Sequence, residues 1–569
     1  MARTISIGAQ GYEDLRTNGY FYVDKTSFVR EWWKSADVVT LVCRPRRFGK
    51  TLNLDTVRCF FSTDYAGRGE ELFGGLNVWE DPDMRALQGM VPVLYVSLAR
   101  VKQSNFADML KRIERLLMAA VREHAYLRAW GGLTDEDRTA LDAVKEGMGA
   151  ETCANVPNML CGLLHRYWGV KPVVLIDEYD APMERAWTGD YWDDASDFMR
   201  DLMNSTFKTN PALGRGLITG VTRVSRESIF SDLNNPEIVT TSSRKYRTSF
   251  GFTQEEVNDA LEEYDLADMR DEVCRWYDGF TFGGQESIYN PWSVTKLLES
   301  GGTFDAYWAN TSGNSLVSKT VRKQGAGFKA DFEELMRGGE VAKIIDEQVV
   351  FSELRTRPNA VWALLLAAGY VTSPGSVPHD MVHTPRRLRL TNLEVEATFD
   401  RMVQGWFSEA EENWDGLASA LMAGDARTAT RALAEVTRYC MSSFDGGRQP
   451  AESQPERFYH GLVLGMLASL RERWSVESNR ESGFGRYDVA LVPVDGARGT
   501  DPAVVIEFKV FDSDDEQELS NTCARALQQI EEKDYVAGLI ARGIAVERIL
   551  TYGIAFRGKE VLVALGARA

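Results

Sequence analysis

Residues 37–61 predict a strand, a loop and a helix in direct succession, and this order constrains the fold more than any other stretch of the chain. An aliphatic run is followed by RPRRFGKT at 44–51, and beyond it apolar residues recur at the spacing of one helix face: Leu52, Leu54, Val57 and Phe61. A glycine, a lysine and a threonine therefore stand where a strand passes into a helix. That position suits phosphate binding, because the unpaired N–H groups and the dipole of a helix's first turn attract anions.

The tripeptide Gly49-Lys50-Thr51 has the chemistry of a nucleotide-binding loop. We expect Lys50 to reach the β- and γ-phosphates of ATP and the Thr51 hydroxyl to ligate Mg²⁺. The first glycine of the usual G-x-x-x-x-G-K-[ST] pattern is missing, because Arg44 occupies its position. The three arginines of the loop, at 44, 46 and 47, either add charge near the phosphates or form a patch that contacts DNA.

The sequence PVVLIDEYD at 172–180 supplies the acidic residues that such a site needs. Four aliphatic residues at 173–176 predict a strand buried on both faces, as in a parallel sheet. Directly after them, Asp177 is expected to hold Mg²⁺ through water and Glu178 to orient or deprotonate the attacking water. A buried strand ending at an exposed acidic turn is the alternative. Together, the two stretches predict a P-loop NTPase, an α/β domain with a parallel sheet flanked by helices.

A further apolar strand is expected at 214–224, and polar residues gather toward its end: Thr219, Thr222 and Arg223. Many ATPases of this kind sense the γ-phosphate from the strand beside the acidic one. We therefore expect Arg223 or Arg226 to contact phosphate oxygens. A strand end with solvated charges would explain the same residues.

Composition limits the class of protein. A chain of 569 residues exceeds what one core organises, and 44% hydrophobic residues suffice for ordinary globular folding. No apolar run approaches the length of a membrane span, the N-terminus has no apolar signal core, and the seven cysteines form no C-x-x-C pair. We therefore expect a cytosolic protein without a disulfide framework or a zinc site. The net charge of −18 argues against general coating of nucleic acid but allows a local basic groove.

After the expected strands, the pattern becomes mainly helical. A small helical lid is indicated by a capped helix at 253–264, a glycine-bearing turn or hairpin at 276–284, and a helix entered through proline at 290–301. Residues 315–445 predict mostly helices, with a core helix at 361–368 and a strand at 386–390.

Two histidines in this middle region have the spacing of a metal pair. His379 and His383 are at i and i+4, but prolines bracket them and the glutamate of an H-E-x-x-H motif is absent. We therefore expect no metal site there. The clearest linker follows at 444–455.

Beyond the linker, two expected strands carry a second candidate site. Glu507 and Lys509 are two residues apart in one strand and so share a face. Asp488 opens the preceding strand, so pairing of the two strands brings Asp488 and Glu507 together. Two carboxylates and a lysine suit Mg²⁺ or Mn²⁺, and we expect both carboxylates at a solvent-reached strand end. The motif E-x-K is common by chance; Asp488 and a following helix with Gln529 and Lys533 make this instance more specific.

Motifs along nearly the whole chain resemble a known bacterial and archaeal family. In order, they are YVDKT, RPRRFGKT, LIDEYD, FSDLNNP, WYDGF, YNPWSV, FYHG, SNRESGFGRYD and IEFKV. The family comprises "AAA-ATPase-like" proteins, which pair a P-loop ATPase with a C-terminal nuclease domain of the PD-(D/E)XK superfamily, and whose RPRRFGKT loop also lacks the leading glycine. The resemblance implies ATPase residues Lys50, Thr51, Asp177 and Glu178, and nuclease residues Asp488, Glu507 and Lys509, with Glu456 or His460 on the preceding helix.

The resemblance also implies an architecture and a set of partners. The expected parts are an AAA-like P-loop ATPase domain at 1–250, a helical lid at 251–310, a mostly helical middle domain at 311–445, and a PD-(D/E)XK nuclease-like α/β domain at 446–569. The expected cofactors are ATP and Mg²⁺, with Mn²⁺ as an alternative at the nuclease site. The expected partners are DNA or RNA and further copies of the chain, with no membrane. Mobile elements and phage defence are the biological settings that the resemblance suggests.

Three functions follow from these motifs. The first is an ATP-regulated, metal-dependent nuclease, and the second is a nucleotide-switched interaction protein whose C-terminal domain binds without cutting. The third, an ATPase that remodels proteins, would not need Asp488 and Glu507. Residues 451–569 carry 14 basic and 19 acidic side chains, a balance of −5, so nucleic-acid binding needs a local groove. The candidates for that groove are Arg480, Arg486, Gln529, Lys533 and the basic stretch 319–323.

Overall fold

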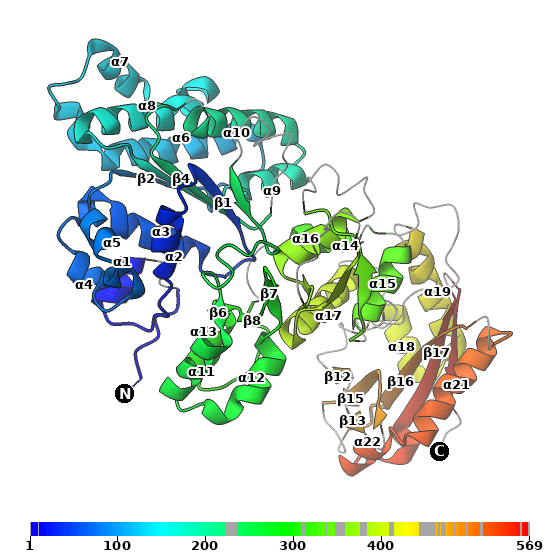
Figure 1. The fold of residues 1–569 in the computed structure, drawn as a ribbon. Coiled ribbons are helices and arrows are strands. Elements are labelled where there is room, and N and C mark those ends of the chain that lie inside the picture. Colours follow the sequence, from blue (N-terminus) through cyan, green and yellow to red (C-terminus); the bar gives the residue numbers. More distant parts are fainter. Residues whose placement is uncertain are drawn as a thin grey trace. The chain divides into compact units, whose positions relative to one another are not determined.

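A computed structural model of the chain divides it into two compact units (Figure 1). Met1–Val317 with Ala342–Val395 form the first unit, and Ser318–Val341 with Glu396–Ala569 form the second. The structure describes the chain except residues 1, 9–10, 209, 223–235, 309–314, 323, 325, 337, 348–358, 376–383, 409–414, 443–462, 464–466, 468–472, 479–480, 483–484, 495–498, 513–515, 558–559 and 567–569. Within the described residues, no helix is both long and apolar enough to cross a membrane.

The first unit is built on a parallel sheet with the strand order β2-β3-β4-β1-β5. Its strands are β1 (Val39–Cys43), β2 (Val93–Ser97), β3 (Val173–Asp177), β4 (Arg215–Gly220) and β5 (Glu237–Val239). Both β1 and β3 are buried along their whole length, because helices cover both faces of the sheet. The predicted α/β domain with a flanked parallel sheet is therefore confirmed.

The helices of this domain divide between the two faces of the sheet (Figure 1). One face is covered by α6 (Phe106–Glu123), α8 (Ala150–Trp168) and α10 (Trp192–Phe207), which pack side by side. On the opposite side, α3 (Lys50–Phe61) packs on β2, β3 and β4. The remaining helices are α1 (Tyr12–Thr17), α2 (Ser27–Lys34), α4 (Gly69–Phe73), α5 (Pro82–Leu87), α7 (Asp135–Ala143) and α9 (Ala181–Thr188).

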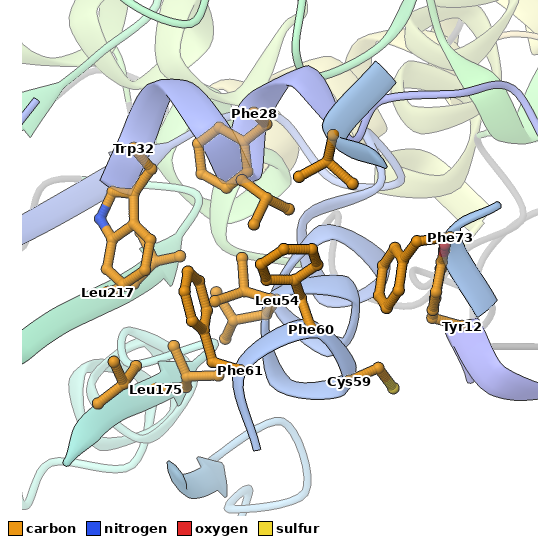
Figure 2. Packing of buried hydrophobic residues seen from close by; sticks show 14 of the residues in the cluster. Tyr12, Phe28, Trp32, Leu54, Cys59, Phe60, Phe61, Phe73, Leu175 and Leu217 are labelled. Carbon is orange, nitrogen blue, oxygen red and sulfur yellow. The ribbon is translucent and has the colours of Figure 1, made fainter. Parts of the chain in front are cut away.

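An aromatic core fixes α3 on the sheet (Figure 2). Phe60 and Phe61 of α3 meet Phe28 and Trp32 of α2, and the strands contribute apolar side chains such as Leu217. These side chains are almost completely buried. Burying one such side chain stabilises a fold by about 1.5–3 kcal/mol, so this packing holds α3 firmly against the sheet.

The region after the sheet combines helices with small sheets. The predicted capped helix is α11 (Gln254–Glu263), whose capping box joins Thr253 and Glu256. The predicted hairpin is β7 (Phe280–Phe282) with β8 (Gln285–Tyr289), which forms a sheet in the order β6-β8-β7. Also present are β6 (Phe252–Thr253), α12 (Arg270–Tyr277) and the predicted helix α13 (Pro291–Glu299).

Residues 342–395 belong to the first unit. They contain α16 (Ala360–Ala368), β10 (Val371–Thr372) and β11 (Arg386–Leu390), so the predicted core helix and strand are confirmed. Three elements cross the sequence boundaries of the units: α14 (Ser315–Arg322), β9 (Val341–Lys343) and α17 (Leu393–Ser408). The expected middle domain thus contributes residues to both units, and the expected bounds of the four domains stay predictions.

The second unit contains a mixed sheet with the order β12-β15-β16-β17-β18. Within it, β16 pairs antiparallel with β15 and parallel with β17, and α21 packs on β16, β17 and β18. Its elements are α15 (Ala326–Met336), α18 (Asp415–Ala423), α19 (Ala426–Ser442), β12 (Trp474–Ser478), β13 (Glu481–Ser482), β14 (Gly485–Arg486), β15 (Val489–Pro493), β16 (Ala503–Val510), α21 (Leu519–Glu532), α22 (Ala537–Ala541), β17 (Ile549–Arg557) and β18 (Glu560–Leu565). This sheet with its covering helix agrees with the predicted nuclease-like α/β domain.

Candidate functional site

The carboxylate of Asp177 lies within a cluster of hydroxyl groups at the carboxyl end of β3. It accepts hydrogen bonds from Thr51 (Oγ1 to Oδ2, 2.9 Å), Thr219 (Oγ1 to Oδ1, 2.7 Å) and Ser97 (Oγ to Oδ2, 3.3 Å). Ser97 is directly opposite Asp177 in the register of β2 and β3, and Thr219 comes from the neighbouring β4. Four elements thus bring oxygen atoms together around one buried carboxylate.

Two of the four members of this cluster are the residues expected from the sequence, and the other two are not. Thr51 and Asp177 were expected to share a metal ion, and the structure brings them into direct contact. Thr219 had been noted only as a polar residue near a strand end. Ser97 had not been singled out at all, because a serine that ends an apolar run has no significance until the strand order is known.

Lys50 is the first residue of α3, and its side chain contacts the loop that precedes the helix. The helix begins after Gly49, whose φ of 75° is a left-handed conformation that glycine adopts without strain. The Lys50 ammonium donates to the carbonyls of Arg44 (2.9 Å) and Pro45 (2.8 Å). Burial lowers the pKa of Lys50, and the negative charges of Glu178 and other nearby carboxylates oppose this effect.

Glu178 follows directly after the central carboxylate and has an unusual backbone. Its φ of 50° is in the left-handed region, which residues other than glycine seldom adopt. Burial raises the pKa of Glu178, and the charge of Asp177 raises it further. A carboxylate with a raised pKa is better suited to take a proton from water. Nearby, Asp180 accepts hydrogen bonds from the backbone N–H groups of Val221 (2.8 Å) and Thr222 (2.9 Å) and so fixes the end of β4.

Arg44 turns its side chain into the protein. The guanidinium donates to the carbonyls of Thr240 (2.5 Å) and Tyr246 (3.4 Å) and lies 4.6 Å from the ring centre of Phe282. The residue has no exposed surface. A buried guanidinium cannot belong to a DNA-contacting patch, so that alternative is wrong for Arg44.

The other two arginines of the loop contact neighbouring helices. Arg46 forms an ion pair with Glu184 of α9 (2.5 Å), and Arg47 lies 4.5 Å from the ring centre of Trp292 in α13. Asn290, the N-cap of α13, donates to the carbonyl of Arg46 (3.5 Å). The start of α13 therefore contacts the loop at 44–49.

The structure also brings the expected nuclease residues together. Val489 pairs with Ile506 in the antiparallel register of β15 and β16, and one further step places Asp488 opposite Glu507. Asp488 accepts a hydrogen bond from the backbone N–H of Phe508 (2.8 Å). The predicted pairing of the two strands is thus confirmed.

Glu507 is held from two sides. Lys509 lies 3.2 Å away (Nζ to Oε1), on the face that its i+2 spacing predicted, and Gln529 of α21 donates to the same oxygen. Gln529 also approaches the hydroxyl of Tyr535 (Nε2 to Oη, 3.1 Å). Glu507 is only 2% exposed and lies inside β16 rather than at its end, so the expectation of a solvent-reached position is wrong for this residue. The covering helix α21 and the paired strands exclude solvent from it.

Several residues considered from the sequence lie outside the described part of the structure: Arg223, Arg226, Lys323, His379, His383, Glu456, His460 and Arg480. Their predicted roles stay predictions. Lys533 is described and exposed at the end of α21, so it stays a candidate for the basic groove.

The donor atoms at both sites fit a hard divalent cation. Mg²⁺ is typically held by one or two carboxylates together with water and substrate phosphates. The Thr51 hydroxyl with Asp177 provides such a set at the first site, and Asp488 with Glu507 provides it at the second. Among the described residues there is no group of three or more histidine, cysteine, aspartate or glutamate side chains that could hold a metal ion. A divalent ion at either site would therefore also need oxygen ligands from water and phosphate.

Comparison with known proteins identifies two family models and one long relative. Residues 6–230 match the model of the AAA-ATPase-like family, described as a predicted AAA-ATPase, and residues 454–564 match the PD-(D/E)XK nuclease superfamily. An uncharacterized protein in the vnfD 5' region of Azotobacter chroococcum mcd 1 is 26% identical over 565 residues, which are 97% of this chain and 96% of that protein. The solved structure of the Aeropyrum pernix ORC1 protein in complex with DNA is similar over 67% of this chain and 93% of that one, at 12% identity and a TM-score of 0.23.

Proposed function

We propose that the protein hydrolyses ATP and couples this to a metal-dependent nuclease, because residues 6–230 match the AAA-ATPase-like family model and residues 454–564 match the PD-(D/E)XK nuclease superfamily model. The substrate of the nuclease is DNA or RNA, and Mg²⁺ serves both sites, with Mn²⁺ as an alternative at the second. In this proposal, copies of the chain associate with one another during ATP hydrolysis and cleavage. The biological setting is mobile elements or phage defence.

The observation that carries the ATPase proposal is the contact between Thr51 and Asp177, 2.9 Å between Oγ1 and Oδ2. These are the two side chains that would share Mg²⁺, which when bound neutralises phosphate charge. Lys50 binds the β- and γ-phosphates from the first turn of α3. Glu178 orients the attacking water and accepts its proton, in agreement with the raised pKa of its carboxyl.

The nuclease proposal is supported by the convergence of Asp488, Glu507 and Lys509 on one face of the β15–β16 pair. A bound divalent ion polarises the scissile phosphate and lowers the pKa of the attacking water. Lys509 stabilises the negative charge that develops on the phosphate. Gln529 holds Glu507 in place through its side-chain amide.

A second function is favoured by the burial of Glu507. Only 2% of its surface is exposed, and its Oε1 atom contacts both Lys509 and Gln529, so this carboxylate is covered by protein rather than open to a metal ion. A nucleotide-switched protein whose C-terminal domain binds nucleic acid without cutting it would have such a site. A remodelling ATPase that acts on protein is a further variant of this switch.

One set of assays separates these functions. ATP binding is measured by calorimetry with Mg²⁺, and phosphate release is followed over time. Labelled DNA, labelled RNA and an unfolded protein substrate are then incubated with Mg²⁺ or Mn²⁺, with and without ATP. Cleavage that depends on the metal ion supports the nuclease. Retention of nucleic acid without cleavage favours the switch, and absence of ATP binding contradicts the ATPase proposal.

A further inference from the structure

A chain of polar contacts leads from Lys50 to a part of the sequence far from the phosphate-binding loop. Lys50 donates to the carbonyl of Arg44, and the Arg44 guanidinium donates to the carbonyl of Thr240 (2.5 Å). The hydroxyl of Thr240 donates in turn to the carboxylate of Glu347. The second and third contacts join segments far apart in the sequence, and all of these residues belong to the first unit.

Glu347 is part of a buried ion pair. Arg386, on β11, donates to Glu347 (2.9 Å) and to the hydroxyl of Ser242 (2.7 Å), and Ser242 also donates to Glu347. The side chains of Arg386 and Glu347 are 6% and 15% exposed. This pair therefore fixes the backbone at 240–242, which in turn receives the guanidinium of Arg44.

The carboxylate of Glu347 also favours the charged form of Arg44. Burial lowers the pKa of Arg44 to about 10, and among the charged groups that raise it again is Glu347. Within the described residues Arg44 forms no ion pair, and its hydrogen bonds go to carbonyl groups. A buried cation is costly without a compensating charge, so the carboxylate of Glu347 helps to keep Arg44 in place.

A second contact brings the same segment to the loop. Gly369, at the end of α16, has a φ of 87°, and a Cβ placed there would come within 3.0 Å of Pro45. Pro45 is the other residue whose carbonyl accepts a hydrogen bond from Lys50. Residues 342–395 thus support both carbonyl groups that receive the Lys50 ammonium.

We propose that Glu347 and Arg386 are positioning residues of the ATPase site, which hold Lys50 in place through Thr240 and Arg44. The proposal rests on the proposed ATPase function. Both residues lie outside 6–230, the part that matches the ATPase family. Segment 342–395 then contributes to the nucleotide site. It affects how tightly the protein binds the phosphates of ATP rather than the base.

The test compares ligands with and without the β- and γ-phosphates. In the full-length protein, Arg386→Met should raise the Kd for ATP about tenfold, because Lys50 loses its fixed position. The Kd for AMP, which lacks the phosphates that Lys50 reaches, should change by less than about twofold. Arg386→Lys should recover most of the ATP affinity, because it keeps the charge beside Glu347. Calorimetry measures ATP binding, and saturation-transfer NMR measures AMP binding.

Two further variants test whether the effect of Arg386 on ATP binding passes through Arg44. In an Arg44→Met background, Arg386→Met should add less than about twofold to the Kd for ATP, because the link is already broken. Lys25→Met removes an ion pair with Glu256 of similar burial, with side chains 10% and 25% exposed, and should leave ATP binding unchanged. If Arg386→Met does not fold, the isosteric Glu347→Gln takes its place, with the same expected direction.

Two results would overturn the inference while the wild type binds ATP. In one, Arg386→Met and Glu347→Gln bind ATP within about twofold of the wild type. In the other, ATP and AMP lose affinity equally, which would indicate a general loss of structure. A wild-type protein that binds no ATP would instead contradict the proposed function itself, and the inference with it.

Discussion

The hydroxyl of Thr51 donates to the carboxylate of Asp177 over 2.9 Å, across a sequence separation of 126 residues. Thr51 lies in the first turn of α3 and Asp177 ends β3, and the parallel sheet brings the two ends to the same edge. This contact places the candidate metal ligands together before any ligand is considered. The predictions for the ATPase site start from it.

Lys50→Ala should abolish ATP binding. The variant removes the ammonium that reaches the phosphates, while the aromatic core that holds α3 stays intact. Calorimetry with Mg²⁺ measures the loss. Lys34→Ala, which removes an exposed lysine paired with Asp81, serves as the control and should bind ATP like the wild type. Equal binding by the Lys50 and Lys34 variants would exclude Lys50 from the phosphate site.

Glu178→Gln should bind ATP and stop turnover, because only the carboxylate that accepts the proton is lost. The pKa of Glu178 is raised by burial, so its carboxylate is protonated at a higher pH than usual. Wild-type turnover should therefore fall as the pH drops through this raised pKa, and binding should fall less. Phosphate release measured against pH gives the profile. A profile that is flat down to the usual carboxylate range would contradict the role.

Thr219→Val should slow ATP turnover about tenfold, because Asp177 loses the hydrogen bond to its Oδ1 atom. The free energy of unfolding should fall by about 1–2 kcal/mol, since a buried carboxylate loses one donor. Chemical denaturation and steady-state kinetics measure the two effects. Thr56→Val, which removes a hydroxyl bonded to a helix carbonyl, is the matched control and should keep normal turnover.

Glu507→Gln and Asp488→Asn should each reduce cleavage of DNA or RNA at least about a hundredfold, because both remove charge that a divalent ion requires. Glutamine is preferred to alanine at position 507, since the side chain is buried and alanine would leave a cavity. Glu560→Gln, on the edge strand β18, is the control. Gel assays with labelled substrates measure the rates, and undiminished cleavage by Glu507→Gln would refute the nuclease assignment.

Stability should depend on pH through Glu394. This carboxyl is buried, accepts hydrogen bonds from Ser293 (2.9 Å) and from the backbone N–H of Trp308 (2.7 Å), and burial raises its pKa to about 7. The folded state thus binds a proton that the unfolded state releases near its usual pKa of 4.5. The contribution to stability is complete below that value and is lost as the pH rises through about 7.

The loss corresponds to roughly 3 kcal/mol in the free energy of unfolding. Urea denaturation between these pH values measures it. Glu394→Gln, which is neutral at every pH, should remove most of the dependence. A wild-type protein with the same stability across this range would show that Glu394 does not titrate as described.

The strands could be predicted because their aliphatic runs fit only a sheet buried on both faces. The approach of Asp488 to Glu507 could also be predicted, since the order of two adjacent strands fixes it. Ser97 could not, because its meaning depends on β2 lying next to β3, which have different places in the sequence. Arg44 was misleading for a related reason: an arginine in a basic loop suggests solvent or phosphate, and its partner Thr240 lies in a distant segment.

The position of β16 between two partners has a consequence for control of the C-terminal site. Because β16 pairs with β17 along its whole length and with β15 at residues 504–506, its paired amide protons exchange with solvent only when the sheet itself opens. Fraying of an edge cannot release Glu507. Any signal that controls this site must therefore change how substrate and metal ion reach Glu507. Hydrogen exchange along β16 should stay slow in both the active and the inactive state.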